Sequence, residues 1–217
     1  MNNNLVKSEI INKVLHLTLN DQINQNTLSF EMINELNKKF QDASNDKDVK
    51  VIVLSSMGKI FCAGHNLKDL NSKRSQSDGG KNYYEKIFKS CSSLMINIVQ
   101  NSKPVIAAIN GIATAAGCQL IASCDLAYAS DRAKFATPGV NIGLFCSTPM
   151  VALSRNVNKK SAMEMLLTGD LIDSKKALEI GLINNFYSSE DLMSKVFEQA
   201  NKISSKSMKT IKIGKKA

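Results

Sequence analysis

The chain has 217 residues, 43% of them hydrophobic and 22% charged, which excludes a disordered protein and a disulfide-held miniprotein and predicts one domain, with or without a helical appendage. No run approaches the roughly 18 apolar residues of a membrane span, and the first residues lack the features of a signal or transit peptide, so we expect a cytoplasmic protein without a membrane partner. The net charge is +9, but the basic residues are mostly lysine, aromatic residues make up 6% and Trp is absent, which disfavours a nucleic-acid partner and favours solvated lysines and small anionic ligands.

Strand patterns and helix patterns alternate along the chain, which predicts an α/β fold. In its first half the chain predicts a strand or hairpin over 9–19, a helix capped by Ser29, a buried strand over 49–54, a short helix opened by Asn66, and a mobile polar loop over 71–81. An amphipathic helix over 83–100 and a strand over 104–109 follow. The rest of the chain predicts a small-residue helix over 116–123, a strand over 126–129, and helices over 159–167, 174–180 and 191–204.

The five cysteines include no C-x-x-C pair, and the chain has only two histidines. This is too little for a zinc site with the usual ligand spacing, so we expect reduced, mostly buried thiols and no metal.

Two loops rich in small residues each follow a predicted strand and precede a helix. They are 61–68, Phe-Cys-Ala-Gly-His-Asn-Leu-Lys, and 110–119, Asn-Gly-Ile-Ala-Thr-Ala-Ala-Gly-Cys-Gln. Backbone N–H groups at a helix N-terminus lack partners and attract negative charge, so two that converge can hold one oxygen, as an oxyanion hole does. For either loop alone, close packing of strand on helix is the alternative explanation. Nucleotide-binding glycine motifs and the G-x-S-x-G elbow are absent from the sequence.

The first loop, the segment 104–111 (Pro-Val-Ile-Ala-Ala-Ile-Asn-Gly) and the pairs Gly117-Cys118 and Cys124-Asp125 form a specific combination. Over residues 9–214 the chain thereby resembles the crotonase (enoyl-CoA hydratase/isomerase) superfamily. The resemblance implies a ClpP/crotonase-like spiral of repeated β-β-α units with C-terminal helices. It also implies a core with the acyl-CoA site over 1–182, followed over 183–217 by the incomplete start of a helical segment that builds a homotrimer or a dimer of trimers.

The resemblance further implies an acyl-CoA or enoyl-CoA ligand, with coenzyme A as part of the substrate and no separate cofactor. The thioester oxygen would lie between the backbone amides of His65 and Ala116. Other positions implied to contact the substrate or coenzyme A are Asn26, Leu28, Ala63, Asn66, Leu67, Lys68, Thr114 and Pro138. For Lys68, a contact near the coenzyme A phosphates or ribose stands beside the alternative of a solvated side chain.

Two positions depart from the family pattern, because Gln119 and Gly139 stand where hydratases of the family place glutamates. Gln119 can hydrogen-bond a water but does not titrate near neutral pH, and Gly139 has no side chain. Losing one general acid or base typically slows a reaction by about 10²–10⁴-fold. Ordinary hydration is therefore in doubt.

Three functions stay open at this point. The chain can be a hydratase/isomerase-type enzyme with another acid or base, a non-catalytic acyl-CoA-binding or regulatory protein of lipid metabolism, or an enzyme of another crotonase reaction such as thioester hydrolysis. The His65 imidazole is one substitute for the lost glutamates, with capping or packing as its alternative role. Asp125 is expected to make a turn or cap hydrogen bond, and the lysines of the tail (206–216) to face water.

Overall fold

The structure, a computed structural model, describes residues 4–217; residues 1–3 of the predicted core lie outside the described part. Its strands are β1 (Val6–Ile11), β2 (Val14–Leu19), β3 (Val51–Ser56), β4 (Ile60–Cys62), β5 (Val105–Ile109), β6 (Ile112–Thr114), β7 (Leu126–Ser130), β8 (Lys134–Ala136), β9 (Ile172–Asp173) and β10 (Asn185–Tyr187). Its α-helices are α1 (Phe30–Asn45), α2 (Leu67–Ser72), α3 (Lys81–Val99), α4 (Ala116–Ser123), α5 (Ser147–Asn156), α6 (Lys159–Thr168), α7 (Ser174–Glu179), α8 (Leu192–Ser204) and α9 (Met208–Lys216). Short 3₁₀ helices are η1 (Lys73–Ser75) and η2 (Pro138–Ile142).

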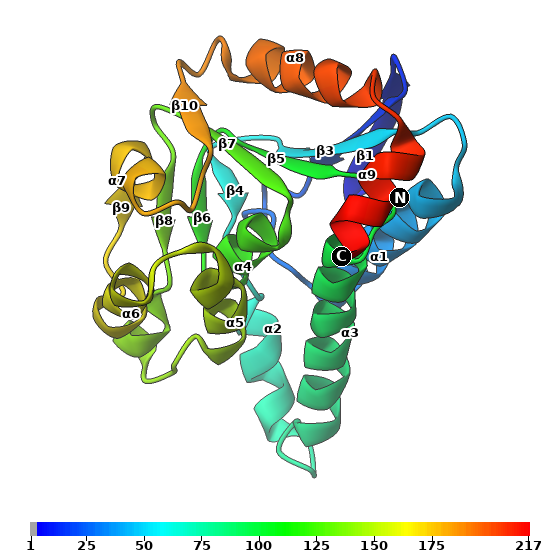
Figure 1. The fold of residues 1–217 in the computed structure, drawn as a ribbon. Helices are drawn as coiled ribbons and strands as arrows, with labels where there is room; N and C mark the ends of the chain where they lie inside the picture. Colours follow the sequence, from blue (N-terminus) through cyan, green and yellow to red (C-terminus); the bar gives the residue numbers. More distant parts are fainter. Residues whose placement is uncertain (1–3) are drawn as a thin grey trace.

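The described strands form a six-stranded sheet in the order β1-β2-β3-β5-β7-β10 and a four-stranded sheet in the order β4-β6-β8-β9. Three times in succession a strand of the large sheet is followed by a short parallel strand of the small one, as β3–β4, β5–β6 and β7–β8. A loop and a helical segment follow each short strand (Figure 1). The expected α/β spiral of β-β-α units is thus confirmed. Because β4, β6 and β8 are parallel, the three loops that follow them leave the small sheet at one edge.

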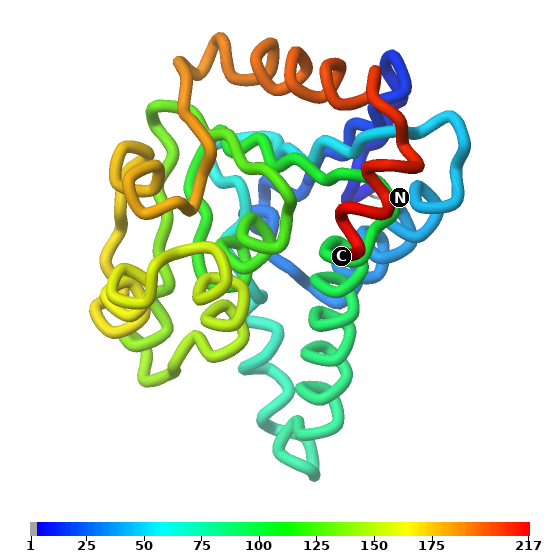
Figure 2. The backbone as a smooth tube through the Cα atoms, in the orientation of Figure 1, coloured from blue at the N-terminus to red at the C-terminus, as the bar shows by residue number. Residues whose placement is uncertain are grey.

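Strand β3 shows why the central strands are apolar throughout. Val51 and Val53 pack in a cluster with α8, whereas Ile52 and Leu54 belong to the main core, which includes buried residues of α1 and α3. Successive side chains of a strand point to opposite faces, so a strand covered on both sides has no polar face. Helix α8 lies along one side of the large sheet in Figure 2.

At the start of the chain, the expected hairpin is confirmed. Strands β1 and β2 pair in antiparallel register around Asn12 and Lys13, whose φ values are +50° and +67°. Positive φ at both central residues is the geometry that matches the twist of a two-residue hairpin.

The expectation of a mobile loop over 71–81 is wrong. Helix α2 extends to Ser72, η1 follows at once, and α3 begins at Lys81, so the segment is mostly the tip of a helical hairpin that projects from the body (Figure 2). The Tyr83 hydroxyl donates to the Asp69 carboxylate, and the Tyr84 hydroxyl donates to the Leu70 carbonyl at 2.9 Å. These bonds attach α2 to α3, and the polar composition of the segment gave no sign of them.

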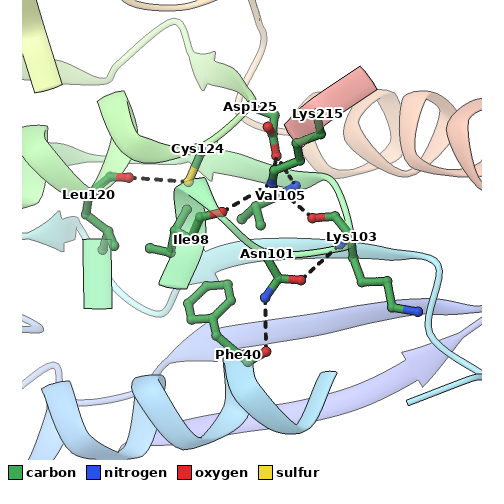
Figure 3. A network of polar contacts seen from close by, with 9 residues as sticks. All are labelled: Phe40, Ile98, Asn101, Lys103, Val105, Leu120, Cys124, Asp125 and Lys215. Atoms are coloured by element: carbon green, nitrogen blue, oxygen red, sulfur yellow. Dashed lines mark hydrogen bonds and ion pairs between the residues drawn. The ribbon is translucent and has the colours of Figure 1, made fainter. Parts of the chain in front are cut away.

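Lys215 also departs from expectation, because it is not solvated like the rest of the tail. Its side chain is 10% exposed, and its Nζ lies 2.5 Å from Asp125 Oδ2, 3.1 Å from the Lys103 carbonyl oxygen and 3.2 Å from that of Ile98 (Figure 3). Asp125 Oδ2 also accepts from the Val105 amide at 2.7 Å, as its expected capping role requires. The ion pair therefore fastens α9 to the turns around β5 and β7.

All five cysteines are buried and free, as expected, and burial raises the pKa of Cys62 and Cys118 to about 12. Within residues 4–217 no helix is long and apolar enough to cross a membrane. Over the same residues no three His, Cys, Asp or Glu side chains gather to hold a metal ion.

We predict that Lys215→Ala lowers the free energy of unfolding by about 1–3 kcal/mol, because the Asp125 carboxylate loses its cationic partner and two carbonyl oxygens lose one donor each. Lys216→Ala, at an exposed neighbouring lysine, serves as the control and should have almost no effect. Urea denaturation measures both. Equal stability of the two variants would contradict the anchoring role of Lys215.

Candidate active site

The loops after β4, β6 and β8 are hydrogen-bonded to one another. The Thr114 hydroxyl donates to the Ala63 carbonyl at 3.1 Å, and the Ala115 amide donates to the Ala136 carbonyl at 2.9 Å. The structure thus brings together Ala63 and Thr114, which are 51 residues apart in the sequence. Pro138 begins η2 two residues after β8.

Two glycines show how closely the first two loops approach. Gly64 has φ +85°, and a Cβ added there would lie 3.2 Å from the Ala116 nitrogen and 3.1 Å from the Thr114 carbonyl oxygen. A Cβ on Gly117 would lie 2.2 Å from the Cys62 carbonyl oxygen. Close packing is therefore the right explanation for Gly117, and the same packing makes the two loops converge.

The backbone turns sharply just before α4. Ala115 has φ +51° and ψ −118°, a conformation that costs an L-residue about 1–3 kcal/mol. Directly after this turn, Ala116 is the first residue of α4, where an N–H has no partner inside the helix. Within residues 4–217, neither the Ala116 amide nor the His65 amide donates to another backbone or side-chain acceptor. Both predicted oxyanion donors are thus available beside Gly64.

The His65 side chain folds back toward the start of α1. Its Nδ1 lies 3.2 Å from the Leu28 carbonyl oxygen, while the Leu28 amide donates to the Gly64 carbonyl at 2.8 Å. The ring packs edge-on against Phe88 of α3, with 5.2 Å between centroids. Burial lowers the pKa of His65, so the ring is neutral at pH 7. In the described structure Nε2 has no hydrogen-bond partner.

The two positions that lost their glutamates differ in structure. Gln119 on α4 is 7% exposed, and its Oε1 has no partner among residues 4–217. Gly139 lies in η2, where an added Cβ would lie 2.8 Å from the Leu144 carbonyl oxygen and 2.9 Å from Cys146 Sγ. The space that a side chain at 139 needs is therefore filled by the chain itself.

The remaining predicted contacts fall into two groups. Asn26 is fully buried, and its Nδ2 donates to the carbonyls of Met57 at 3.0 Å and Ile60 at 2.8 Å, so its side chain holds the turn before β4. Asn66 caps α2, because its side chain accepts hydrogen bonds from the backbone amides of Lys68 and Asp69. Leu67 and Lys68 are exposed on that first turn, where they can meet a ligand.

Two of the hollows in the described part of the chain are large, and both lie outside these loops. One, of about 740 Å³, follows α3 past Tyr84, Phe88 and Ile96, so it reaches the ring that packs on His65. Another, of about 650 Å³, is lined by His16, Ser55 and residues of α8 and shares no residue with the loops. Sequence reasoning missed the packing of Phe88 on His65. In the sequence Phe88 is only one apolar residue of the predicted helix over 83–100, and nothing there marks it as close to the first loop.

His16, unlike His65, has a partner for each ring nitrogen. Its Nδ1 lies 3.1 Å from Glu9 Oε1, and its Nε2 lies 2.8 Å from Ser55 Oγ. The ring also packs edge-on against Phe197. Glu9, His16 and Ser55 therefore form a hydrogen-bonded series on the wall of the second hollow.

Comparison with known proteins identifies relatives of the whole described fold. The family model for enoyl-CoA hydratase/isomerase matches residues 9–217. A mouse protein, enoyl-CoA hydratase domain-containing protein 3, mitochondrial, is 43% identical over 202 residues, which cover 93% of this chain and 66% of the mouse protein. The crystal structure of human enoyl-CoA hydratase domain-containing protein 3 superposes with a TM-score of 0.91 at 40% identity, covering 98% of this chain and 82% of that chain. An enoyl-CoA hydratase from Mycobacterium smegmatis gives 0.92 at 42% identity, covering 97% and 80%.

These relatives confirm the superfamily and correct one expectation. The chain spans just under two thirds of the length of the mouse protein. The mouse, rat and human relatives are all named as mitochondrial, so the expected cytoplasmic location is wrong. Composition and the first few residues carried too little information to decide location.

We predict that Gly64→Ala lowers the free energy of unfolding by at least about 1 kcal/mol more than Gly79→Ala. Both positions have positive φ, but a Cβ at 79 meets nothing within 4 Å. The pair therefore shares the backbone strain, and the difference between them measures the crowding between the loops. Denaturant unfolding gives both values, and equal losses would show that the loops are not in contact.

A second matched pair tests the filled space at Gly139. Gly139→Ala is expected to destabilise the fold by about 1–3 kcal/mol through overpacking, and Gly139→Glu by more. Gly214→Ala, on α9 with open space around it, should be neutral or stabilise by up to about 1 kcal/mol. Thermal unfolding compares them. An unchanged melting temperature in Gly139→Ala would contradict the packing described.

Proposed function

The chain belongs to the enoyl-CoA hydratase/isomerase family, and on that basis we propose that it binds an acyl-CoA or enoyl-CoA thioester where the first two loops converge. The thioester oxygen accepts hydrogen bonds from the amides of His65 and Ala116. The observation that carries this proposal is the approach of Gly64 to the Ala116 nitrogen, within 3.2 Å of an added Cβ. A side chain at 64 would fill the space that the oxygen needs.

Two amide donors aimed at one oxygen favour chemistry next to the thioester carbonyl. As a proton leaves the neighbouring carbon, or a nucleophile adds one carbon further on, negative charge develops on that oxygen as an enolate. Donors already in place stabilise this charge without reorganisation, and removing one donor typically costs about 3–4 kcal/mol. Helix α4 begins at Ala116, so its dipole acts in the same direction.

The coenzyme A part of the ligand follows the start of α2 in this proposal. The backbone of Ala63 and Asn66 and the exposed side chains of Leu67 and Lys68 line its path, with the Lys68 ammonium placed for phosphate or ribose oxygens. Asn26 and Leu28 act from behind, by holding the turn and the His65 ring. Because the mouse, rat and human relatives are named as mitochondrial, we propose a mitochondrial protein. As the crotonase resemblance implies, we further propose that residues 183–217 contribute to a homotrimer or a dimer of trimers.

Hydration with two carboxylates does not suit this site. Gln119 has no titrating group, and a side chain at 139 meets Leu144 and Cys146. A hydratase or isomerase reaction here therefore needs a different acid or base. The filled space at Gly139 also supports a second candidate, a non-catalytic acyl-CoA-binding or regulatory protein.

Binding and carbonyl polarisation can be tested together with crotonyl-CoA. Calorimetry is expected to show binding, and the infrared carbonyl stretch of the bound thioester is expected to shift to lower frequency because two N–H groups polarise it. Gly64→Ala should abolish the shift, whereas Gly79→Ala should keep it. Binding with an unshifted carbonyl band would contradict the oxyanion hole, and no binding would contradict the whole proposal.

A further inference from the structure

Polar side chains interrupt the face of the large sheet that α8 covers. Val14 and Val53 are buried on this face in the cluster with α8, and His16 and Ser55 each follow one of these valines by two residues. Residues two apart in a strand share a face. Helix α8 begins at Leu192, and the second hollow, of about 650 Å³, lies where His16, Ser55 and Leu192 meet. Polar residues on an otherwise apolar buried face call for an explanation.

The pairing of three strands brings a carboxylate, an imidazole and a hydroxyl to one wall of this hollow. Glu9 of β1 pairs with His16 of β2, and Thr18 of β2 pairs with Ser55 of β3. His16 Nδ1 lies 3.1 Å from Glu9 Oε1, and His16 Nε2 lies 2.8 Å from Ser55 Oγ. All three of these side chains belong to residues that line the hollow. A carboxylate on Nδ1 and a serine hydroxyl on Nε2 form the arrangement that activates a serine for attack.

The hydrogen bonds also fix where the protons lie. A carboxylate can only accept, so Nδ1 of His16 carries the ring proton and Nε2 accepts from Ser55. The Thr18 hydroxyl lies 3.3 Å from Nε2 and 3.2 Å from Ser55 Oγ, so the shorter distance makes Ser55 the donor to Nε2 and leaves Thr18 to donate to Ser55. Phe197 packs edge-on against the ring, with 5.5 Å between centroids, and holds it in this orientation.

We propose that Glu9, His16 and Ser55 form a second active site, which hydrolyses small carboxylic esters. Ser55 is the nucleophile and His16 is the base. Glu9 is a positioning residue, because it acts through the ring of His16 rather than on the ester. The hollow shares no residue with the converging loops, so this activity is independent of the proposed thioester site.

The rest of the lining agrees with an ester as substrate. Ala108, Leu192 and Met193 give the hollow an apolar part for a short acyl chain. Lys7 also lines the hollow, and its ammonium favours the negative charge that develops on the ester oxygen during attack. The start of α8 at Leu192 adds the positive end of a helix dipole. A volume of about 650 Å³ is within the usual range for small-molecule sites.

The reaction balances with these groups and one water. Ser55 Oγ forms a bond to the carbonyl carbon while Nε2 takes its proton, and the carbonyl electron pair moves to the oxygen. When the carbonyl re-forms, the bond to the alcohol oxygen breaks and Nε2 returns the proton to that oxygen, which leaves an acyl group on Ser55. Water then attacks the acyl carbon with Nε2 again as base. The bond to Oγ breaks, Oγ regains its proton, and the products are one carboxylic acid and one alcohol.

Hydrolysis of 4-nitrophenyl acetate and labelling with a fluorophosphonate test this assignment on the full chain. The wild type should release 4-nitrophenol with turnover and carry the label on Ser55, as located by mass spectrometry. Ser55→Ala and His16→Asn should each lower kcat by about 10²-fold or more and abolish the label. Ser56→Ala is the matched control, because that hydroxyl donates to Asn110 Oδ1 at 2.9 Å instead, and it should keep both readouts.

Glu9 is tested by the separation of kcat from KM. Glu9→Gln should lower kcat by about tenfold or more, because the ring proton loses its charged acceptor, while KM stays within about threefold because no contact with the ester is lost. The Glu9 side chain is 62% exposed, so the fold should tolerate this change.

Four results would overturn the proposal. They are a wild type that hydrolyses no faster than buffer, a label on another residue such as Thr18 in place of Ser55, an unchanged kcat in Ser55→Ala or His16→Asn, and an equal loss in Ser56→Ala. If His16→Asn does not fold, as judged by circular dichroism, Glu9→Gln decides, and an unchanged kcat there overturns the proposal. Crotonyl-CoA binding is measured separately, so the failure of either function leaves the other standing.

Discussion

The site depends on one contact, between α4 and the end of β4. Gly117 has no side chain, and the place where its Cβ would lie is 2.2 Å from the Cys62 carbonyl oxygen. Any larger residue would push α4 away from β4. Because α4 lies this close, its first amide reaches the loop at Gly64, and Ala115 is held at φ +51°.

The spiral of parallel strands provides the support for this contact. Strands β4, β6 and β8 end at one edge of the small sheet. Their loops are joined by hydrogen bonds to backbone carbonyls, one donated by the Thr114 hydroxyl and one by the Ala115 amide. The oxygen-binding groups proposed here are also backbone groups, so neither donor is supplied by a side chain. Substitutions at 119 and 139 change which side chains reach the substrate. Because the backbone supplies the donors and side chains supply the other groups, the fold can stay the same while the side-chain chemistry at the site changes.

Sequence patterns predicted the parts of this structure that depend on local or periodic signals. The strands at 49–54, 104–109 and 126–129 were recognisable because strands buried on both faces are continuously apolar. Strands β4, β6 and β8 were not, because three residues are too few for any period. The pairing of Lys215 with Asp125 joins residues 90 positions apart, which no local pattern reports.

The candidate site was predictable only as far as its motifs. The two loops were recognisable from their small residues between a strand and a helix, the donors at His65 and Ala116 came from the resemblance, and the structure adds that the loops converge. That Leu144 and Cys146 fill the space beside Gly139, and that His65 Nε2 and Gln119 Oε1 both lack partners, depends on how distant segments pack. The residue types at 119 and 139 alone therefore could not show how the chain packs around these two positions.

A crystal structure of the protein with crotonyl-CoA bound tests the central claim most directly. The account predicts that the thioester oxygen lies within about 2.7–3.1 Å of both the His65 and the Ala116 amide nitrogens. A ligand whose thioester oxygen contacts neither amide, or which occupies the hollow beside His16 instead, would contradict it.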